Sequence, residues 1–417
     1  MLQDYIKPAW YIFTILNRFL EGFLIPCANN KSGGILGHSH HDTFVILESF
    51  LEERGNSMNK KKICAALMAM SFVVGTGLSM NVEAATRAEI AKISVKENGS
   101  NFQYWNKDSA SFKALTSYVK DVTNKKSKNY IPEEDRIAVF DMDGTLLGER
   151  TPCYFEWMMY LERALNDPTY TPSKEDREYA QVVKKAIENQ SIPEDMEGKE
   201  AKSQASVFAG MTQDEYNAFV KKFMETPAEG LTNLKRGEEF YLPMAEVVSY
   251  LKENDFDIWI VSGSDRDAQR VLMDGVLPIK RDHFIGTDIM TLASGQGNTD
   301  GLEYVYDKDK DTLVRGQFVL KDVKMNKVSN IAREIGRQPV LAFGNSSGDA
   351  SMFNYTISKN KYKALAFSLC CDDLEDDLGN IKKADKMKAD CQKNGWIPVS
   401  MRDDWKTIYG YNVKVAK

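Results

Sequence analysis

The fold is decided by one short stretch of sequence, IAVFDMDGT at residues 137–145. Its first four residues form a continuous apolar run, which is typical of a strand buried on both faces of a parallel sheet. Two aspartates, a glycine and a threonine follow at once. The stretch therefore predicts a buried strand whose carboxyl end carries acidic, polar chemistry.

Further apolar runs repeat this pattern along the chain. They are IWIV at residues 258–261, VLAF at 340–343 and ALAF at 364–367. Helical patterns at residues 244–254 and 326–335 separate them, and Gly336 follows the second pattern as a helix stop. This alternation of strand and helix predicts an α/β fold with a doubly wound parallel sheet.

Polar residues follow each of the first three runs, at the edge where such sheets bind their ligands. They are Asp141 and Asp143 after the first run, Ser262 and Gly263 after the second, and GNSSGD at residues 344–349 after the third. The sequence therefore predicts a functional site at the carboxyl ends of these strands.

The residue types at this edge suit phosphoryl transfer, which needs an in-line nucleophile, a proton donor for the leaving alcohol and positive charge around the phosphoryl oxygens. Asp141 is the candidate nucleophile, because a carboxylate can form an acyl phosphate. Asp143 is the candidate general acid and base. Lys327, on the helix before the third run, is the candidate cation, with Lys321 and Lys324 as competitors. The alternative for an Asp-x-Asp at a strand end is a simple turn.

A divalent cation is also expected, because two close carboxylates would repel an anionic substrate. Hard oxygen ligands favour Mg²⁺. Asn345 and Asp349 supply further oxygens after the third run, and the Ser262 hydroxyl can hydrogen-bond a phosphoryl oxygen beside Gly263. The predicted metal ligands are Asp141, Asp143, Asn345 and Asp349, with Mg²⁺ as the cofactor.

Taken in order, these motifs resemble those of the haloacid dehalogenase superfamily, in its phosphoserine-phosphatase-like branch. The first motif is matched by residues 141–145, the second by Ser262, the third by Lys327 and the fourth by residues 344–353. Four motifs in the right order and on the right strands make a specific match. The resemblance covers residues 136–353.

The resemblance implies a Rossmann-like core and a bound Mg²⁺. The ion would be held by the Asp141 side chain, the Asp143 backbone carbonyl and an acid of the fourth motif. An acid at the Asp143 position implies a phosphatase or a phosphomutase, because the dehalogenases lack it.

The fourth motif departs from the family pattern at Asn345, where phosphoserine phosphatases usually carry an aspartate. The amide oxygen can bind a metal but brings no charge. Either Asp349 takes over as the acidic ligand, which we prefer, or the metal binds more weakly. The second alternative leads to a rival function, a catalytically weakened protein that binds phosphorylated ligands without releasing phosphate.

Residues 149–239 contain no comparable apolar run and are predicted to form a helical cap domain inserted after the first motif strand. The core then comprises residues 85–148 and 240–417. Thr212 and Glu215 have the spacing of a capping box at the start of one cap helix.

Substrate selection is expected in the cap. Tyr154, Phe155, Trp157 and Tyr160 follow the first motif. They form either an aromatic cage for a quaternary ammonium such as phosphocholine or packing between cap and core, which we prefer. Glu149 lies one residue from the place where phosphoserine phosphatases hold an acid for the substrate amine.

An export signal is predicted upstream of the core. Residues 58–62 (MNKKK) are basic, residues 63–80 are apolar, and Ala84 ends a small-residue cleavage pattern, so residues 58–84 are interpreted as a signal peptide. A transmembrane anchor is the alternative, but the run is short and interrupted by glycines, so no stable membrane anchor is expected. Residues 1–57 are interpreted as a disordered segment from a mis-assigned upstream start. The protein is therefore expected to be secreted or periplasmic.

The charge composition limits the classes of molecule that the protein is expected to bind. A formal net charge of -6 argues against nucleic-acid binding, so a small phosphorylated substrate is expected. Export argues against a phosphomutase, whose sugar-phosphate substrates are mostly intracellular.

Two local expectations concern the rest of the core. In an oxidising compartment, Cys370 or Cys371 is expected to pair with Cys391. Residues 303–320 are predicted to form a hairpin with its turn at residues 307–311.

Overall fold

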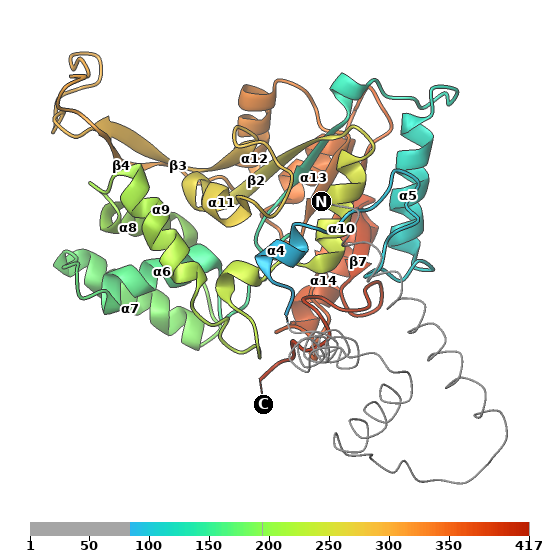
Figure 1. Cartoon of the computed structure of the whole chain (residues 1–417), viewed down its shortest axis with the longest axis horizontal. Helices are drawn as coiled ribbons and strands as arrows, with labels where there is room; N and C mark the ends of the chain where they lie inside the picture. Colours follow the sequence, from blue (N-terminus) through green and yellow to red (C-terminus); the bar gives the residue numbers. More distant parts are fainter. Residues whose placement is uncertain (1–83, 194, 417) are drawn as a thin grey trace, which may run out of the picture. The chain divides into compact units, whose positions relative to one another are not determined.

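A seven-stranded sheet forms the centre of the computed structural model, which describes residues 84–193 and 195–416 (Figure 1). The strand order is β4-β3-β2-β1-β5-β6-β7, and every neighbouring pair is parallel except β3 with β4. The strands are β1 (Ile137–Phe140), β2 (Asp257–Asp265), β3 (Phe284–Ala293), β4 (Leu313–Leu320), β5 (Leu341–Gly344), β6 (Leu365–Cys370) and β7 (Ile397–Ser400). The predicted α/β fold with a doubly wound parallel sheet is confirmed.

Helices precede, connect and cover these strands. They are α4 (Arg87–Ile90), α5 (Ala110–Thr123), α6 (Phe155–Leu161), α7 (Lys174–Glu188), α8 (Met196–Val207), α9 (Gln213–Met224), α10 (Leu242–Lys252), α11 (Arg266–Met273), α12 (Met325–Asn330), α13 (Ala350–Ile357) and α14 (Ile381–Asn394). Short 3-10 turns lie at Glu133–Asp135 and Arg236–Glu238, and π-helical turns at Glu162–Asn166 and Ile331–Ile335.

Successive residues of β1 point to opposite faces of the sheet. Ala138 and Phe140 pack into one hydrophobic cluster with residues of α5 and α10, whereas Ile137 and Val139 pack into a second cluster with residues of α13 and α14. Both faces are therefore covered by helices, which explains why the strand sequences are continuously apolar.

The helices α6 to α9 lie between β1 and β2 in the sequence and group together beside β3 and β4 in Figure 1. We call this group of helices the cap. The capping box at the start of α9 is confirmed: the Thr212 hydroxyl accepts from the Glu215 N–H at 3.2 Å, and Glu215 accepts from the Thr212 N–H at 2.8 Å. Two connections join this group to the sheet, and they meet where the Gly148 N–H donates to the Glu239 carbonyl at 2.9 Å.

The sequence analysis missed β3 and β7 and was wrong about the first arm and the turn of its hairpin, whereas the predicted second arm contains β4. The antiparallel pair joins β3 to β4, so the predicted first arm and turn lie in the connection at residues 294–312 instead. β3 mixes polar and apolar residues, and β4 carries Arg315 and Gly316, so neither has the continuous apolar run that revealed the central strands.

The predicted disulfide is also absent. Cys153, Cys370, Cys371 and Cys391, the cysteines of the described residues, are all buried free thiols. Adjacent residues at the end of β6 face opposite sides, so Cys371 lies in the first hydrophobic cluster and Cys370 and Cys391 lie in the second. The thiols serve here as apolar packing groups.

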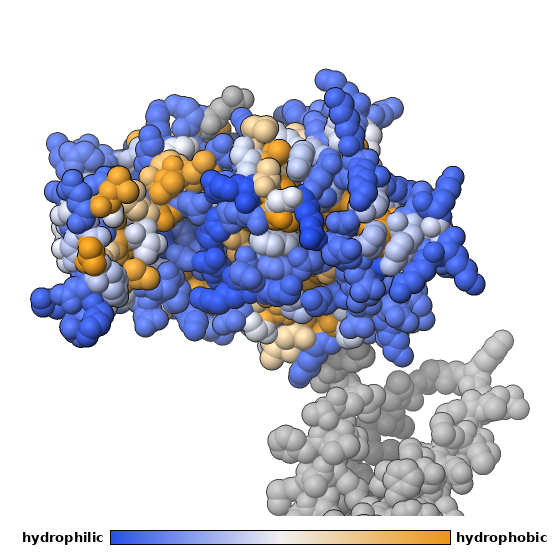
Figure 2. All heavy atoms as spheres, turned by 90° about the horizontal axis from the view of Figure 1, so that it is seen from above, coloured by the Kyte–Doolittle hydropathy of each residue, from blue (hydrophilic) through white to orange (hydrophobic). Residues whose placement is uncertain are grey.

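The molecular face in Figure 2 is mostly hydrophilic, with hydrophobic groups in separate patches. Across residues 84–193 and 195–416, no helix is both long and apolar enough to cross a membrane. The predicted segment 1–57 and the signal peptide, apart from Ala84, lie outside the described residues.

Candidate active site

A cavity of about 350 Å³ opens at the carboxyl ends of β1, β2 and β5. The structure brings together every side chain predicted for the site, and all of them line this cavity: Asp141, Asp143, Glu149, Ser262, Gly263, Lys327, Asn345 and Asp349. Residues of the cap helix α6 and of the C-terminal helix α14 complete its walls.

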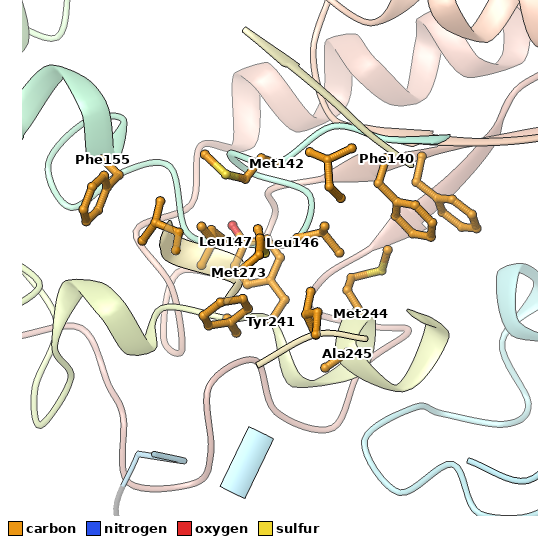
Figure 3. Packing of buried hydrophobic residues seen from close by; sticks show 14 of the residues in the cluster. Phe140, Met142, Leu146, Leu147, Phe155, Tyr241, Met244, Ala245 and Met273 are labelled. Carbon is orange, nitrogen blue, oxygen red and sulfur yellow. The ribbon is translucent and has the colours of Figure 1, made fainter. Parts of the chain in front are cut away.

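The turn after β1 is anchored so that its two aspartates face the cavity. Met142, between them, is fully buried, and Leu146 and Leu147 pack in the same hydrophobic cluster near Tyr241 (Figure 3). The Asp141 N–H continues the pairing with β5 by donating to the Phe343 carbonyl at 2.9 Å. The apolar residue between the carboxylates thus fixes the backbone that carries them.

Lys327 forms the electrostatic centre of the site. Its Nζ lies 2.7 Å from Asp141 Oδ1 and 2.7 Å from Asp349 Oδ1, and it donates to the Val261 carbonyl at 2.6 Å. Burial lowers the pKa of Lys327, but the two carboxylates outweigh it and raise that pKa above its usual value. Burial, followed by the charge of Asp349, raises the pKa of Asp141 to about 7, although Lys327 opposes the shift.

Asp143 has a different environment from Asp141. The Ser264 hydroxyl donates to its Oδ2 at 2.6 Å, whereas Oδ1 is buried and has no hydrogen-bond partner among the described residues. Burial raises the pKa of Asp143 to about 8, against the opposing effect of the Ser264 hydrogen bond. A carboxyl group that keeps its proton near neutral pH is suited to protonate a leaving group.

Both carboxylate oxygens of Asp349 already have ion-pair or hydrogen-bond partners. One of its oxygens contacts Lys327, and the other accepts from the N–H groups of Asn345 and Ser346, both at 3.0 Å, and from the Ser346 hydroxyl at 3.3 Å. The side chain therefore shapes the turn after β5 and holds Lys327. This arrangement argues against our preference for Asp349 as the acidic metal ligand.

Asn345 lies directly over the turn after β1. A Cβ atom on Gly144, whose φ is +74°, would stand 1.9 Å from Asn345 Nδ2 and 2.8 Å from the Glu149 carboxyl carbon. Only glycine allows this close approach. The neutral amide of Asn345, rather than an acid of the fourth motif, is thus the group that lies against Gly144 in the turn after β1.

The oxygens left for a metal ion are hard donors, namely the Asp141 carboxylate, the Asp143 backbone carbonyl and the Asn345 amide. Such donors fit Mg²⁺, although they bring a single formal negative charge. Within the described ranges, no group of three or more acidic, histidine or cysteine side chains is arranged to hold a metal ion.

The cap contributes fewer aromatic groups than a cage needs. Tyr154 and Trp157 line the cavity, with ring centroids 5.6 Å apart, but Trp157 is 1% exposed. Phe155 and Tyr160 are buried in the hydrophobic core. Packing therefore accounts for most of this aromatic cluster.

Three functional contributions escaped the sequence analysis. Ser264, whose hydroxyl donates to Asp143, was not singled out. Lys321, named as a competitor of Lys327, lies in the cavity wall and contacts Glu156 of α6 at 2.9 Å. Lys383 of α14 forms an ion pair with Glu149. No local motif signals the last two, because their roles depend on elements far apart in the sequence.

The chain belongs to the haloacid dehalogenase-like hydrolases, whose family model matches residues 138–354. No curated protein matches it.

Solved structures are similar at low identity. Cytosolic 5'-nucleotidase IIIB bound to cytidine is 11% identical with a TM-score of 0.43, covering 72% of this chain and 88% of that one. A phosphoserine phosphohydrolase-like protein from Francisella tularensis subsp. tularensis SCHU S4 is 16% identical with a TM-score of 0.33, covering 60% and 92%. A protein of unknown function from Bordetella pertussis Tohama I is 14% identical with a TM-score of 0.41, covering 63% and 97%.

Proposed function

We propose that the protein is an exported, Mg²⁺-dependent phosphatase that hydrolyses small phosphomonoesters through a phosphorylated Asp141. The observation that carries this proposal is the contrast between two carboxyl groups in one cavity. Asp141 is paired with Lys327 at 2.7 Å, whereas Asp143 has an oxygen without a hydrogen-bond partner among the residues that the structure describes and a pKa raised to about 8 by burial. One group suits attack, and the other suits proton transfer.

In the first half-reaction, an ionised Asp141 oxygen attacks phosphorus and the bond from phosphorus to the leaving oxygen breaks. Asp143 donates its proton to that oxygen, so the alcohol departs neutral. In the second, the Asp143 carboxylate removes a proton from a water molecule that attacks the same phosphorus. Inorganic phosphate is released, and Asp141 returns to its starting state.

The remaining residues hold the phosphoryl group. Lys327 and the Ser262 hydroxyl would bind its oxygens, with Gly263 beside them; all three residues line the cavity, which supports this assignment. Mg²⁺, held by Asp141, the Asp143 carbonyl and Asn345, would neutralise charge on the phosphoryl oxygens.

The cavity volume of about 350 Å³ supports small substrates, of the phosphoserine or phosphocholine type. The predicted signal peptide supports export.

A second candidate is a binding protein that retains phosphorylated ligands without turning them over. The neutral Asn345 and the fully engaged Asp349 favour it, because both reduce the charge offered to a metal.

Phosphate release from p-nitrophenyl phosphate by the purified protein distinguishes these candidates. We expect turnover with Mg²⁺, loss of turnover in EDTA, and loss in Asp141→Asn. A folded protein that binds phosphate esters but releases no phosphate from a panel of small phosphomonoesters would support the binding protein instead.

A further inference from the structure

Helix α14 forms one wall of the cavity, although it begins well after the family match ends at residue 354. The sheet order β1-β5-β6 places the connection from β6 to α14 beside the turn after β5. Lys383, Lys386 and Met387 line the cavity from the first turns of the helix. Part of the site is therefore built from residues outside the region that the family model matches.

The wall is held in a fixed position. Met387 is buried in the second hydrophobic cluster, and the Asn380 side chain caps α14 by accepting from the Lys383 N–H at 3.0 Å. The Lys383 side chain is 29% exposed and forms an ion pair with Glu149, which is 5% exposed. Because Glu149 packs against Gly144, this ammonium group stands beside the catalytic turn.

Among the described residues, the lysines of the α14 wall have fewer acidic partners than Lys321 and Lys327, which also line the cavity. Lys327 is shared by two carboxylates, and Lys321 faces two glutamates of the cap. In the described part of the chain, Lys386 has a single ion-pair partner, Asp390 at 2.7 Å, and its side chain is 70% exposed. Lys383 keeps further N–H donors beyond its contact with Glu149.

The acidic side of the cavity lies across from this wall, on the cap. Glu197 of α8 lines the cavity and forms no ion pair or hydrogen bond within the described residues. Glu149, the predicted contact for a substrate amine, is already neutralised by Lys383. A cationic leaving group can thus find a partner on the cap, but not at Glu149.

We propose that Lys383 and Lys386 form a subsite for a second anionic group, a carboxylate on the leaving group of the substrate. This inference rests on the proposed phosphatase function and narrows its substrates to phosphorylated hydroxy acids or amino acids. A carboxylate between two ammonium groups accepts charge-assisted hydrogen bonds, while Glu149 keeps Lys383 in place.

The test compares O-phosphoserine with O-phosphoethanolamine, which differ by one carboxylate. We expect kcat/KM to be at least about tenfold higher for phosphoserine, as one charge-assisted hydrogen bond provides. Lys383→Met and Lys386→Met should each lower this ratio, mainly through KM for phosphoserine. Glu149→Gln should raise it, because a competing negative charge is removed. Lys383→Arg should retain most of it.

Lys382→Met is the matched control, because Lys382 is exposed on the same helix and does not line the cavity. Its ratio should equal that of the unmodified protein. If Lys383→Met proves unstable, titration calorimetry of both ligands with Asp141→Asn and Asp141→Asn/Lys386→Met measures the same preference without turnover.

Active enzyme with a ratio of one or less, or a ratio insensitive to Lys383 and Lys386, would overturn the subsite. Absence of p-nitrophenyl phosphate turnover would instead remove the proposed function on which the subsite rests.

Discussion

The ion pairs at the carboxyl edge of the sheet differ in distance from those on the cap. At the sheet edge, Lys327 lies 2.7 Å from both Asp141 and Asp349. Across the cavity, Lys321 contacts Glu156 at 2.9 Å but stands 3.8 Å from Glu200, whose two oxygens are buried without hydrogen-bond partners in the described part of the chain. Both ion pairs of Lys327 at the edge are thus short, whereas one of the two ion pairs of Lys321 on the cap side is long. We expect substitutions at the edge to remove catalysis and those in the cap to act more mildly.

The largest effect is expected at the nucleophile. Asp141→Asn keeps the size of the side chain but removes the attacking oxygen, so turnover of p-nitrophenyl phosphate should fall by at least about 10⁴-fold. A fall of less than about tenfold, in a protein whose thermal unfolding is unchanged, would show that Asp141 does not form the covalent bond.

Lys327→Met should cost both activity and stability. It leaves Asp141 and Asp349 as uncompensated buried charges, so the free energy of unfolding should drop by about 3–5 kcal/mol. Activity should fall by about 10²–10³-fold, as after loss of one oxyanion donor. Lys324→Met is the control, because Lys324 is exposed in the same cavity wall. Equal effects of the two substitutions in urea denaturation would contradict the account.

Activity should depend on pH through the two aspartates. Asp141 acts ionised, so kcat/KM falls as pH drops below its pKa of about 7, and Asp143 acts protonated, so kcat/KM falls as pH rises above about 8. Raising the Mg²⁺ concentration should move the acidic limb to lower pH, because a cation favours the carboxylate. The alkaline limb should appear with O-phosphoserine, whose leaving alcohol needs a proton, and should be absent with p-nitrophenyl phosphate, whose leaving group does not. A profile that is flat between pH 6 and 9 would exclude both assignments.

Asn345→Asp adds a negative charge at the carboxyl edge of the sheet and so tests how the charge of this edge affects metal binding. An extra acidic ligand should tighten Mg²⁺ binding by about tenfold, since affinity follows the charge of the ligands. Titration calorimetry without substrate measures this directly. Asp349→Asn should instead destabilise the turn after β5, and a selective loss of Mg²⁺ affinity with unchanged stability would show that Asp349 is the ligand after all.

The smallest effect is expected in the cap. Burial raises the pKa of Glu200 well above its usual value, and neither carboxyl oxygen has a hydrogen-bond partner within the described residues, so Glu200→Gln breaks no hydrogen bond and should change little. Its free energy of unfolding should stay within about 1 kcal/mol of the original. Glu156→Gln breaks a contact to Lys321 and should cost more, about 1–3 kcal/mol. A larger loss in Glu200→Gln than in Glu156→Gln would reverse the order expected from their contacts.

The sequence could predict the central strands and the site residues that directly follow them. Continuous apolar runs identified β1, β2, β5 and β6, and the polar residues after three of them converge because parallel strands share one edge. The strand β7 was missed because Pro398 interrupts its apolar pattern, and β3 was missed because it mixes polar and apolar residues, whereas β4 was placed only as an arm of a hairpin.

The charges that surround the site were harder to predict. Lys383 reaches Glu149 across 234 positions of the chain, and nothing local marks it as part of the site. The pairing of Asp349 with two backbone N–H groups likewise depends on the shape of its turn. Sequence motifs indicate the candidate reacting groups. Which charged side chains form ion pairs with one another depends on the folded structure, so the sequence alone does not predict it.

The most direct test of the central claim is the pre-steady-state reaction of Asp143→Asn with p-nitrophenyl phosphate. The p-nitrophenolate leaving group needs no proton, so phosphorylation of Asp141 should proceed, whereas its hydrolysis lacks a general base. The account predicts a burst of one p-nitrophenolate per protein molecule, with a phosphoryl group found on Asp141 by mass spectrometry after acid quench. Multiple turnovers without a burst, and no phosphorylated Asp141, would contradict it.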